Sequence, residues 1–369
     1  MPFFNTTGSN NLEWVGESIC QTIREALASE GVLTLDRQAR EEGFRRLSVK
    51  PYTVLTKATV MRMGESLDAD QVIFGSFQVT APEGQDRSKG TIRIHAQAID
   101  LRKARRGPEY SDHGPLDDLA RLQSRIAWQT MEFVLADRRP TEQQFRQRLP
   151  VIRLDALESY VRGTLAGAAD QKLKYFTQAI RLDPNYSRAN FEIGRLHFER
   201  RAYRPAAEAL QKVPTTDVRY REATFLLGLC RYYLADFAAS ERAFQTVAQQ
   251  VPLNEVINNL GAAQSRLNQT AVALENFKKA MEGDPADPAY HFNVGYALLH
   301  QGDLDAAAER FRAVLARNPD DAEATTMLGR CLRKSAAKAP VRSEGFERLK
   351  ENYQESAYWQ LKAVLEPKR

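Results

Sequence analysis

The chain has 369 residues, of which 43% are hydrophobic and 27% are charged, as is ordinary for a soluble globular protein. No stretch approaches the roughly 18 consecutive apolar residues of a membrane span, so the sequence predicts none. The net charge is +5, but 52 Lys and Arg are interleaved with 47 Asp and Glu, which argues against nucleic acid as a partner. Cys20, Cys230 and Cys331 fit neither a disulfide framework nor a metal motif.

Alternating helical and strand patterns run through residues 3–135 and predict an α/β domain, a small mixed sheet with flanking helices. The expected helices are Leu12–Leu27, Tyr52–Met63 and Leu116–Leu135. The expected strands are Val32–Leu35, Gln71–Thr80 and Thr91–Asp100, with Pro82–Gly90 as the loop between the last two. The basic cluster after them, Arg102, Lys103, Arg105 and Arg106, is interpreted as a solvated turn, with a phosphate-contacting loop as the alternative.

Several short strings in this region have a recognisable order. They are Pro2-Phe3-Phe4-Asn5, Leu12-Glu13-Trp14-Val15-Gly16-Glu17, Leu67-Asp68-Ala69-Asp70-Gln71-Val72-Ile73-Phe74-Gly75-Ser76 and Asp118-Leu119-Ala120-Arg121-Leu122-Gln123. In these strings the segment 1–135 resembles the TolB amino-terminal-like domain of bacteria. The resemblance implies a fold rather than a chemistry, and a setting ahead of tetratricopeptide repeats in periplasmic or signalling proteins.

An α/β domain of this pattern needs a first strand that pairs with the one around Val32–Leu35. Only Pro2, Phe3 and Phe4 precede the polar stretch Asn5–Asn11, whereas strands usually run about five or six residues. We therefore expect Met1 to be an internal start. The chain as given is predicted to be cytoplasmic; with an upstream export signal it would be periplasmic, although three unpaired cysteines suit a reducing compartment better.

After a polar linker, 136–152, with one expected helical turn at Thr141–Phe145, the sequence becomes periodic. Glycines recur about every 34 residues, at Gly194, Gly228, Gly261, Gly295 and Gly329. Prolines follow the same period at Pro184, Pro252, Pro285 and Pro319, with one period skipped after the first. Bulky residues stand at a fixed spacing behind four of the glycines, and small residues one helical turn before them. The bulky set is Leu210, Phe244, Phe277 and Phe311, and the small set is Ala206, Ser240, Ala273 and Ala307.

This pattern predicts pairs of helices in which a small residue on the first helix allows close approach of the second, and a proline ends the second. It resembles the tetratricopeptide repeat, which implies an all-α, right-handed superhelix over 153–336. We place repeats at 157–186 (degenerate), 187–220, 221–253, 254–287 and 288–321, followed by one extra helix over 322–336. Pro214 predicts that the second helix of 187–220 ends early.

The periodicity stops after Ala339-Pro340. Residues 343–366 carry Phe346, Leu349, Tyr353, Ala357 and Leu361 at helical spacing, which predicts one long helix. Because the last helix pair of a repeat array needs a cover, we expect 337–369 to form a C-terminal capping helix and tail.

No catalytic constellation is found: there is no glycine-rich phosphate loop, no GxSxG and no HExxH, and the five histidines are scattered. The sequence therefore predicts a protein that is not an enzyme, with no cofactor and no metal site.

The predicted concave wall of the superhelix carries candidate binding residues. Asn259 and Asn293 occupy the same slot in consecutive repeats, and such an amide ladder can hold the backbone of an extended peptide. The alternative is that these side chains only solvate the groove. The candidate groove residues are Arg195, Phe225, Tyr233, Asn258, Asn259, Arg266, Asn293, Tyr296, His300 and Arg330.

Two functions follow from these predictions. The first is a scaffold in which the groove binds a protein or peptide partner and the α/β domain binds a second partner or forms a homodimer. The second is a regulatory or ligand-sensing module in which the α/β domain binds a small molecule. A sensor needs a deep pocket with converging polar groups, whereas a scaffold needs a long groove.

Overall fold

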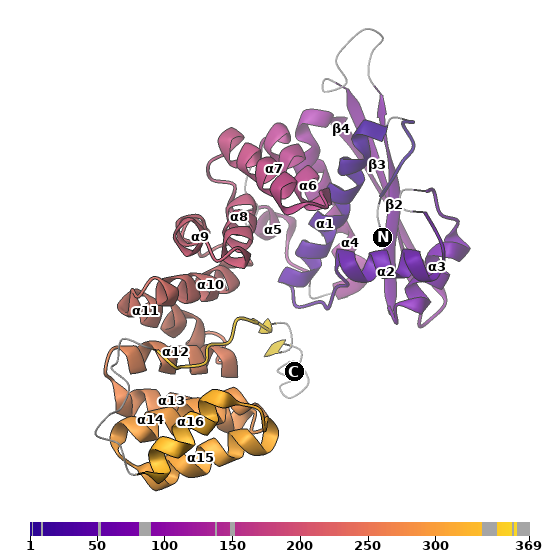
Figure 1. The fold of residues 1–369 in the computed structure, drawn as a ribbon. Helices are drawn as coiled ribbons and strands as arrows, with labels where there is room; N and C mark the ends of the chain where they lie inside the picture. The colour runs from indigo at the N-terminus through magenta and orange to yellow at the C-terminus, as the bar shows by residue number, and fades with distance from the viewer. Residues whose placement is uncertain are drawn as a thin grey trace. The chain divides into compact units, whose positions relative to one another are not determined.

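A computed structural model describes residues 1, 3–8, 10–50, 53–80, 90–136, 139–147, 152–333, 345–355 and 358–359 (Figure 1). Their contacts divide the chain into two compact units, Met1–Ala189 and Asn190–Arg369. The first unit thus includes the α/β region and the first helix pair of the repeat region. None of the described helices is long and apolar enough to cross a membrane. The domain limits proposed from the sequence stay a prediction.

The first unit contains a four-stranded mixed sheet of order β1-β2-β3-β4. Its strands are β1 (Phe3–Asn5), β2 (Gln71–Thr80), β3 (Thr91–Asp100) and β4 (Arg105–Pro115). β1 is parallel to β2, and the other two pairs are antiparallel. The helices before and between the strands are η1 (Asn10–Leu12), α1 (Glu13–Ser29), α2 (Arg37–Arg46) and α3 (Lys57–Ser66), and those after them are η3 (Leu116–Asp118), α4 (Leu119–Leu135) and α5 (Glu142–Gln147).

The alternation of apolar residues in the strands explains how the sheet is covered. Ile92, Ile94, Ala96 and Ala98 of β3 are fully buried, and α4 packs against β3 and β4 while α1 packs against β1 and α4. On the opposite face of the sheet, Val72 and Phe74 of β2 and Ile99 of β3 form a second small core with Val60 of α3. Helices therefore lie on both faces of this mixed sheet.

Two predictions for this region are wrong, and one strand was not predicted. Val32–Leu35 is not a strand, and β1 pairs with β2 instead; Leu33 and Leu35 are exposed, so the short apolar run packs in no sheet. The expected helix Tyr52–Met63 begins only at Lys57, where the Thr56 hydroxyl caps it. The sequence does not predict β4, because its Gly107-Pro108 and its charges are typical of a turn. The expected loop at 82–90 lies outside the described residues except for Gly90.

Eleven helices, α6 to α16, follow at the predicted period. The first pair, in the first unit, is α6 (Leu154–Leu165) and α7 (Ala169–Leu182), and α8 (Ser187–Glu199) crosses the boundary between the units. The second unit continues with α9 (Tyr203–Leu210), α10 (Tyr220–Tyr233), α11 (Phe237–Ala248), α12 (Asn254–Arg266), α13 (Thr270–Gly283), α14 (Pro288–Gln301), α15 (Leu304–Arg317) and α16 (Ala322–Leu332). As predicted, α9 stops before Pro214.

The glycine ladder lies at the contact within each pair. A Cβ built on Gly228 would come within 2.8 Å of the Phe244 ring, and one on Gly261 within 3.0 Å of the Phe277 ring. These phenylalanines are fully buried. Only a residue without a side chain leaves room for the ring of the second helix, which is why both positions recur together at the repeat period.

The predicted capping helix over 343–366 is wrong for residues 345–354, which are not helical, whereas Glu355, Tyr358 and Trp359 are helical. The parts of the 337–369 prediction at 337–344, 356–357 and 360–369 lie outside the described residues. Figure 1 shows this segment, in yellow, passing α12 in the direction of α10. Residues 345–355 are called the tail from here on. Their spacing of Phe346, Leu349 and Tyr353 suits a helix locally, but their backbone groups find partners on distant side chains instead.

Candidate functional site

The tail lies against the first helices of the repeats and is held through its backbone. Asn293 on α14 donates from Nδ2 to the carbonyl oxygen of Arg348 at 2.9 Å and accepts at Oδ1 from the Arg348 N–H at 2.8 Å. Asn259 on α12 makes the same pair of bonds with Lys350, at 2.7 and 2.8 Å. Each amide side chain therefore satisfies both the donor and the acceptor of one tail residue, as a neighbouring β-strand would.

A third asparagine, Asn258, links Asn293 to the same tail residue. Asn258 donates to the Arg348 carbonyl oxygen at 2.8 Å, and its own Oδ1 accepts from Asn293 at 2.8 Å. The three asparagines have no exposed surface, and none of their polar atoms lacks a partner. A buried amide without a hydrogen-bond partner lowers the stability of a protein by about 1–3 kcal/mol. A peptide backbone supplies the missing partners, so these asparagines favour one bound against them.

The side chains at odd-numbered tail positions contact α10 and α12 or the apolar clusters beside these helices. Glu347 accepts from the hydroxyls of Ser265 at 2.6 Å and Tyr232 at 3.1 Å. Leu349 packs against the apolar clusters of α10 to α14. Farther along, Glu351 accepts from Tyr233 at 2.8 Å, and the Tyr353 ring lies 5.1 Å from that of Phe225.

The side chains at even-numbered positions contact α14 and α16. Phe346 lies 6.0 Å from the ring of Tyr296. The Arg348 guanidinium makes two bonds of 2.7 Å to Asp321 and one of 3.0 Å to Glu323. Lys350 forms an ion pair with Asp287. The tail thus runs from the C-terminal repeats toward the N-terminal ones, with alternate side chains on its two sides.

Charge and burial set the protonation of this surface. The hydrogen bonds from Arg348 hold the pKa of the Asp321 carboxyl below its usual value of 3.8. Burial alone would lower the pKa of the Arg348 guanidinium, but Asp321 and Glu323 raise it, so the pair is fully ionised. Burial raises the pKa of Tyr296 to about 12. Around Arg348 and Tyr296 the groove therefore presents a neutral hydroxyl and the ionised carboxylate of Asp321.

The residues predicted from sequence fall into two groups. Phe225, Tyr233, Asn258, Asn259, Asn293 and Tyr296 all contact the tail, and Arg266 lies beside it, since a Cβ added at Gly345 would be 2.7 Å from its guanidinium. His300 packs edge-on against Tyr296 at 4.5 Å. Arg195 forms ion pairs with Glu192 and Glu199 on its own helix, and the Arg330 guanidinium lies 3.9 Å from the Met327 sulfur.

Sequence reasoning missed the two acidic residues, Asp287 and Asp321. Each caps the start of its helix, accepting from Ala289 N–H and Ala324 N–H at 2.9 Å. They lie one repeat apart, as do Asn259 and Asn293. Comparing the residue before each first helix along the repeat would have found them.

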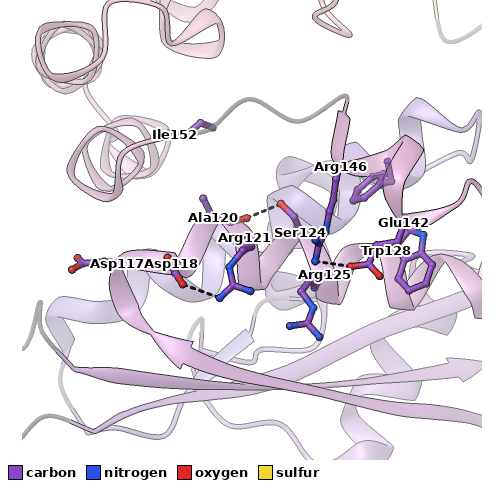
Figure 2. A pocket seen from close by; sticks show the side chains of 11 residues that line it. Asp117, Asp118, Ala120, Arg121, Ser124, Arg125, Trp128, Glu142, Arg146 and Ile152 are labelled. Carbon is purple, nitrogen blue, oxygen red and sulfur yellow. Dashed lines mark hydrogen bonds and ion pairs between the residues drawn. The ribbon is translucent and has the colours of Figure 1, made fainter.

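A second recess lies in the first unit, beside α4 and α5, with a volume of about 300 Å³ (Figure 2). Figure 2 shows Arg121 turned to Asp118, at 2.8 Å, and Arg146 turned to Glu142, at 2.7 Å. Arg125 pairs with Asp112 at 3.4 Å. Because the three arginines of this recess already form ion pairs, their charges do not indicate a site for a small anionic ligand. Among the described residues no group of His, Cys, Asp or Glu has the arrangement of a metal site.

Comparison with known proteins gives matches over the helical region. Models of the tetratricopeptide repeat match residues 173–217, 265–331 and 298–365. Anaphase-promoting complex subunit 3 of Schizosaccharomyces pombe is 25% identical over 169 residues, which are 46% of this chain and only 25% of that protein.

Two solved structures are also similar to part of this chain. YrrB, described as a TPR protein with an unusual peptide-binding site, is 18% identical with a TM-score of 0.44, covering 47% of this chain and 91% of its own. MamA from Desulfovibrio magneticus RS-1 is 19% identical with a TM-score of 0.43, covering 47% and 99%. Within residues 173–217 and 265–333, where the matching repeat models and the observed helices coincide, the chain is built of tetratricopeptide repeats.

Proposed function

We propose that this protein is a non-enzymatic scaffold whose repeat groove, the wall formed by α10, α12, α14 and α16, binds an extended peptide segment of a partner protein. The observation that carries the proposal is the amide ladder. Asn259 and Asn293 bond both backbone groups of the residues they hold, and backbone bonds of this kind fit any extended peptide. In this structure the tail fills the place of that peptide.

Further support comes from the nature of the tail contacts. Its apolar residues, Phe346, Leu349 and Tyr353, are only partly buried, and most of its other contacts are hydrogen bonds and ion pairs. A segment held in this way can exchange with a competing peptide of the same chemistry, because little apolar surface must be re-exposed. The tail then acts as an internal competitor for the partner.

The N-terminal region has a separate place in this proposal. Its mixed sheet agrees with the fold that the TolB-like resemblance implies, and the resemblance itself stays a prediction. Binding of a second partner, a homodimer through this region and the small-molecule alternative also stay predictions.

The test uses the full-length chain with a weakened tail. In Arg348→Glu/Lys350→Glu the tail is repelled by Asp321 and Asp287, while every groove residue is unchanged. A fluorescein-labelled synthetic peptide with the sequence of residues 345–355 is titrated, and its anisotropy is measured. We expect at least tenfold tighter binding than to the parent chain, whose tethered tail competes at an effective concentration of about millimolar.

Two further variants make this test specific. Lys279→Glu/Arg312→Glu makes the same charge change at exposed positions on α13 and α15 and should bind the peptide as weakly as the parent. Adding Asn259→Ala/Asn293→Ala to the weakened-tail variant should abolish binding without changing the circular dichroism. If the folded weakened-tail variant does not bind the peptide, the proposed function is wrong.

A further inference from the structure

The groove holds the tail in a fixed register of two tail residues for each repeat. Asn293 holds Arg348 and Asn259 holds Lys350, so a step of one full repeat along the groove matches a step of two along the peptide. Asp321 and Asp287 follow the same rule with the side chains of those residues. A tail residue is thus held by an asparagine within one first helix and by the aspartate that caps the following first helix.

The first basic subsite surrounds Arg348. Its guanidinium is bidentate on Asp321, and it lies 3.7 Å above the centre of the Phe292 ring. Asp321 is 7% exposed and Arg348 22% exposed, so solvent screens this pair only in part. A planar cation over an aromatic face and beside a carboxylate is the arrangement that selects arginine over neutral side chains.

The second basic subsite surrounds Lys350. Its ammonium group pairs with Asp287 and lies 4.9 Å from the centre of the Tyr290 ring. Between the two cations, Leu349 points to the other side of the tail and packs against apolar clusters. The acidic residues belong only to the last two repeats, because the corresponding residues before α12 and α10 are Leu253 and Arg219.

From this register we infer that the partner segment carries a basic–aliphatic–basic tripeptide, with the two basic side chains on Asp321 and Asp287 and the aliphatic one between α10 and α14. The inference rests on the proposed function and specifies its ligand. The tail, with Arg348-Leu349-Lys350, imitates that segment and must leave the groove before the partner binds. The occupant is a segment of another protein, bound in extended form and antiparallel to the order of the repeats.

The test compares labelled peptides on the full-length weakened-tail variant, Arg348→Glu/Lys350→Glu. The first peptide has the sequence of residues 345–355. In the second, the arginine and lysine are replaced by glutamine; in the third, one glycine inserted after the leucine places the basic residues three apart. We expect the second and third peptides to bind at least tenfold more weakly than the first at about 0.1 M salt, and the difference to shrink as salt rises.

A groove variant identifies the subsites without disturbing the helix starts. Asp287→Asn/Asp321→Asn removes both charges, while asparagine caps a helix as well as aspartate does. In the weakened-tail background this variant should bind the basic peptide no more than about threefold better than the glutamine peptide, because only Glu323 and the rings of Phe292 and Tyr290 then still favour the cations.

The outcomes separate the two proposals. If none of the peptides binds the folded weakened-tail variant, the proposed function fails. If all bind equally well, the groove takes extended peptides but the basic–aliphatic–basic inference is overturned. If instead the parent chain forms dimers that Arg348→Glu/Lys350→Glu abolishes, the natural occupant of the groove is the tail of a second copy. The inference that a segment of another protein binds there is then wrong.

Discussion

Asn259 and Asn293 are one repeat apart in sequence, and the tail residues whose backbone they hold are only two apart. An extended chain alternates its side chains with a period of two, so every residue held in this way presents its side chain to the same wall. The helical repeat and the extended peptide therefore share a common register. This register places Arg348 and Lys350 on the face that meets the two aspartates, and Glu347, Leu349 and Glu351 on the other.

The glycine ladder makes a prediction about stability. Gly228→Leu should lower the free energy of unfolding by roughly 1–3 kcal/mol, because its side chain would overlap the buried Phe244 ring. Gly329 is the matched control: α16 has no described second helix over it, and the nearest atoms to an added Cβ belong to Arg333 at 3.5 Å. The free energy of unfolding of both variants is measured by denaturant titration. Equal loss of stability would mean that the ladder does not mark the helix contacts.

Acidification should release the tail. The pKa of Asp321 is depressed in the folded chain, so its contribution to tail docking is complete above its usual value of 3.8 and is lost as the pH falls through the lower folded value. In unfolding measurements the parent should exceed Asp321→Asn in stability at pH 6, and the difference should narrow steadily below pH 4. A difference that stays constant from pH 6 to pH 3 would show that the Arg348 ion pair does not stabilise the folded chain.

The buried thiols give a chemical probe of the repeat core. Burial raises the pKa of Cys230 to about 12, so on the order of one molecule in ten thousand carries the thiolate at pH 8. Burial also raises the pKa of Cys331. Iodoacetamide at pH 8 should therefore modify both cysteines slowly in the native chain and rapidly in denaturant, as read by mass spectrometry. Rapid native labelling of Cys230 would contradict the packing of α10 against α11.

The repeats could be predicted from sequence because each helix pair is a local unit with its own signature. Gly228 and Phe244 lie close together in the sequence and meet within one pair, so the repeat period alone places their contact. The same period gives the pairing of Asn259 with Asn293. β4 was missed since its partners are supplied by β3 across a hairpin, and its own residues, with Gly107 and Pro108, have weak strand propensity.

The conformation of the tail could not be predicted from local sequence patterns. Phe346, Leu349 and Tyr353 satisfy a helical pattern, yet the partners of the Arg348 and Lys350 backbone are side chains 55 and 91 residues away. Tertiary contacts of this kind outweigh a helix propensity of a few tenths of a kcal/mol per residue. The predicted pair of Asn259 and Asn293 indicated that an extended segment could bind in the groove, but nothing in the local pattern of residues 345–355 identified them as that segment.

The most direct test of the amide ladder is backbone hydrogen exchange in the tail of the full-length chain. The amides of Arg348 and Lys350 should be protected in the parent and in the control Asn276→Ala, whose side chain bonds Gln264 outside the groove. In Asn259→Ala/Asn293→Ala they should exchange at least tenfold faster, while the amides of α10 keep their protection. If the tail amides exchange as fast in the parent as in the double variant, or stay protected in the double variant, the asparagines do not hold an extended peptide in this groove.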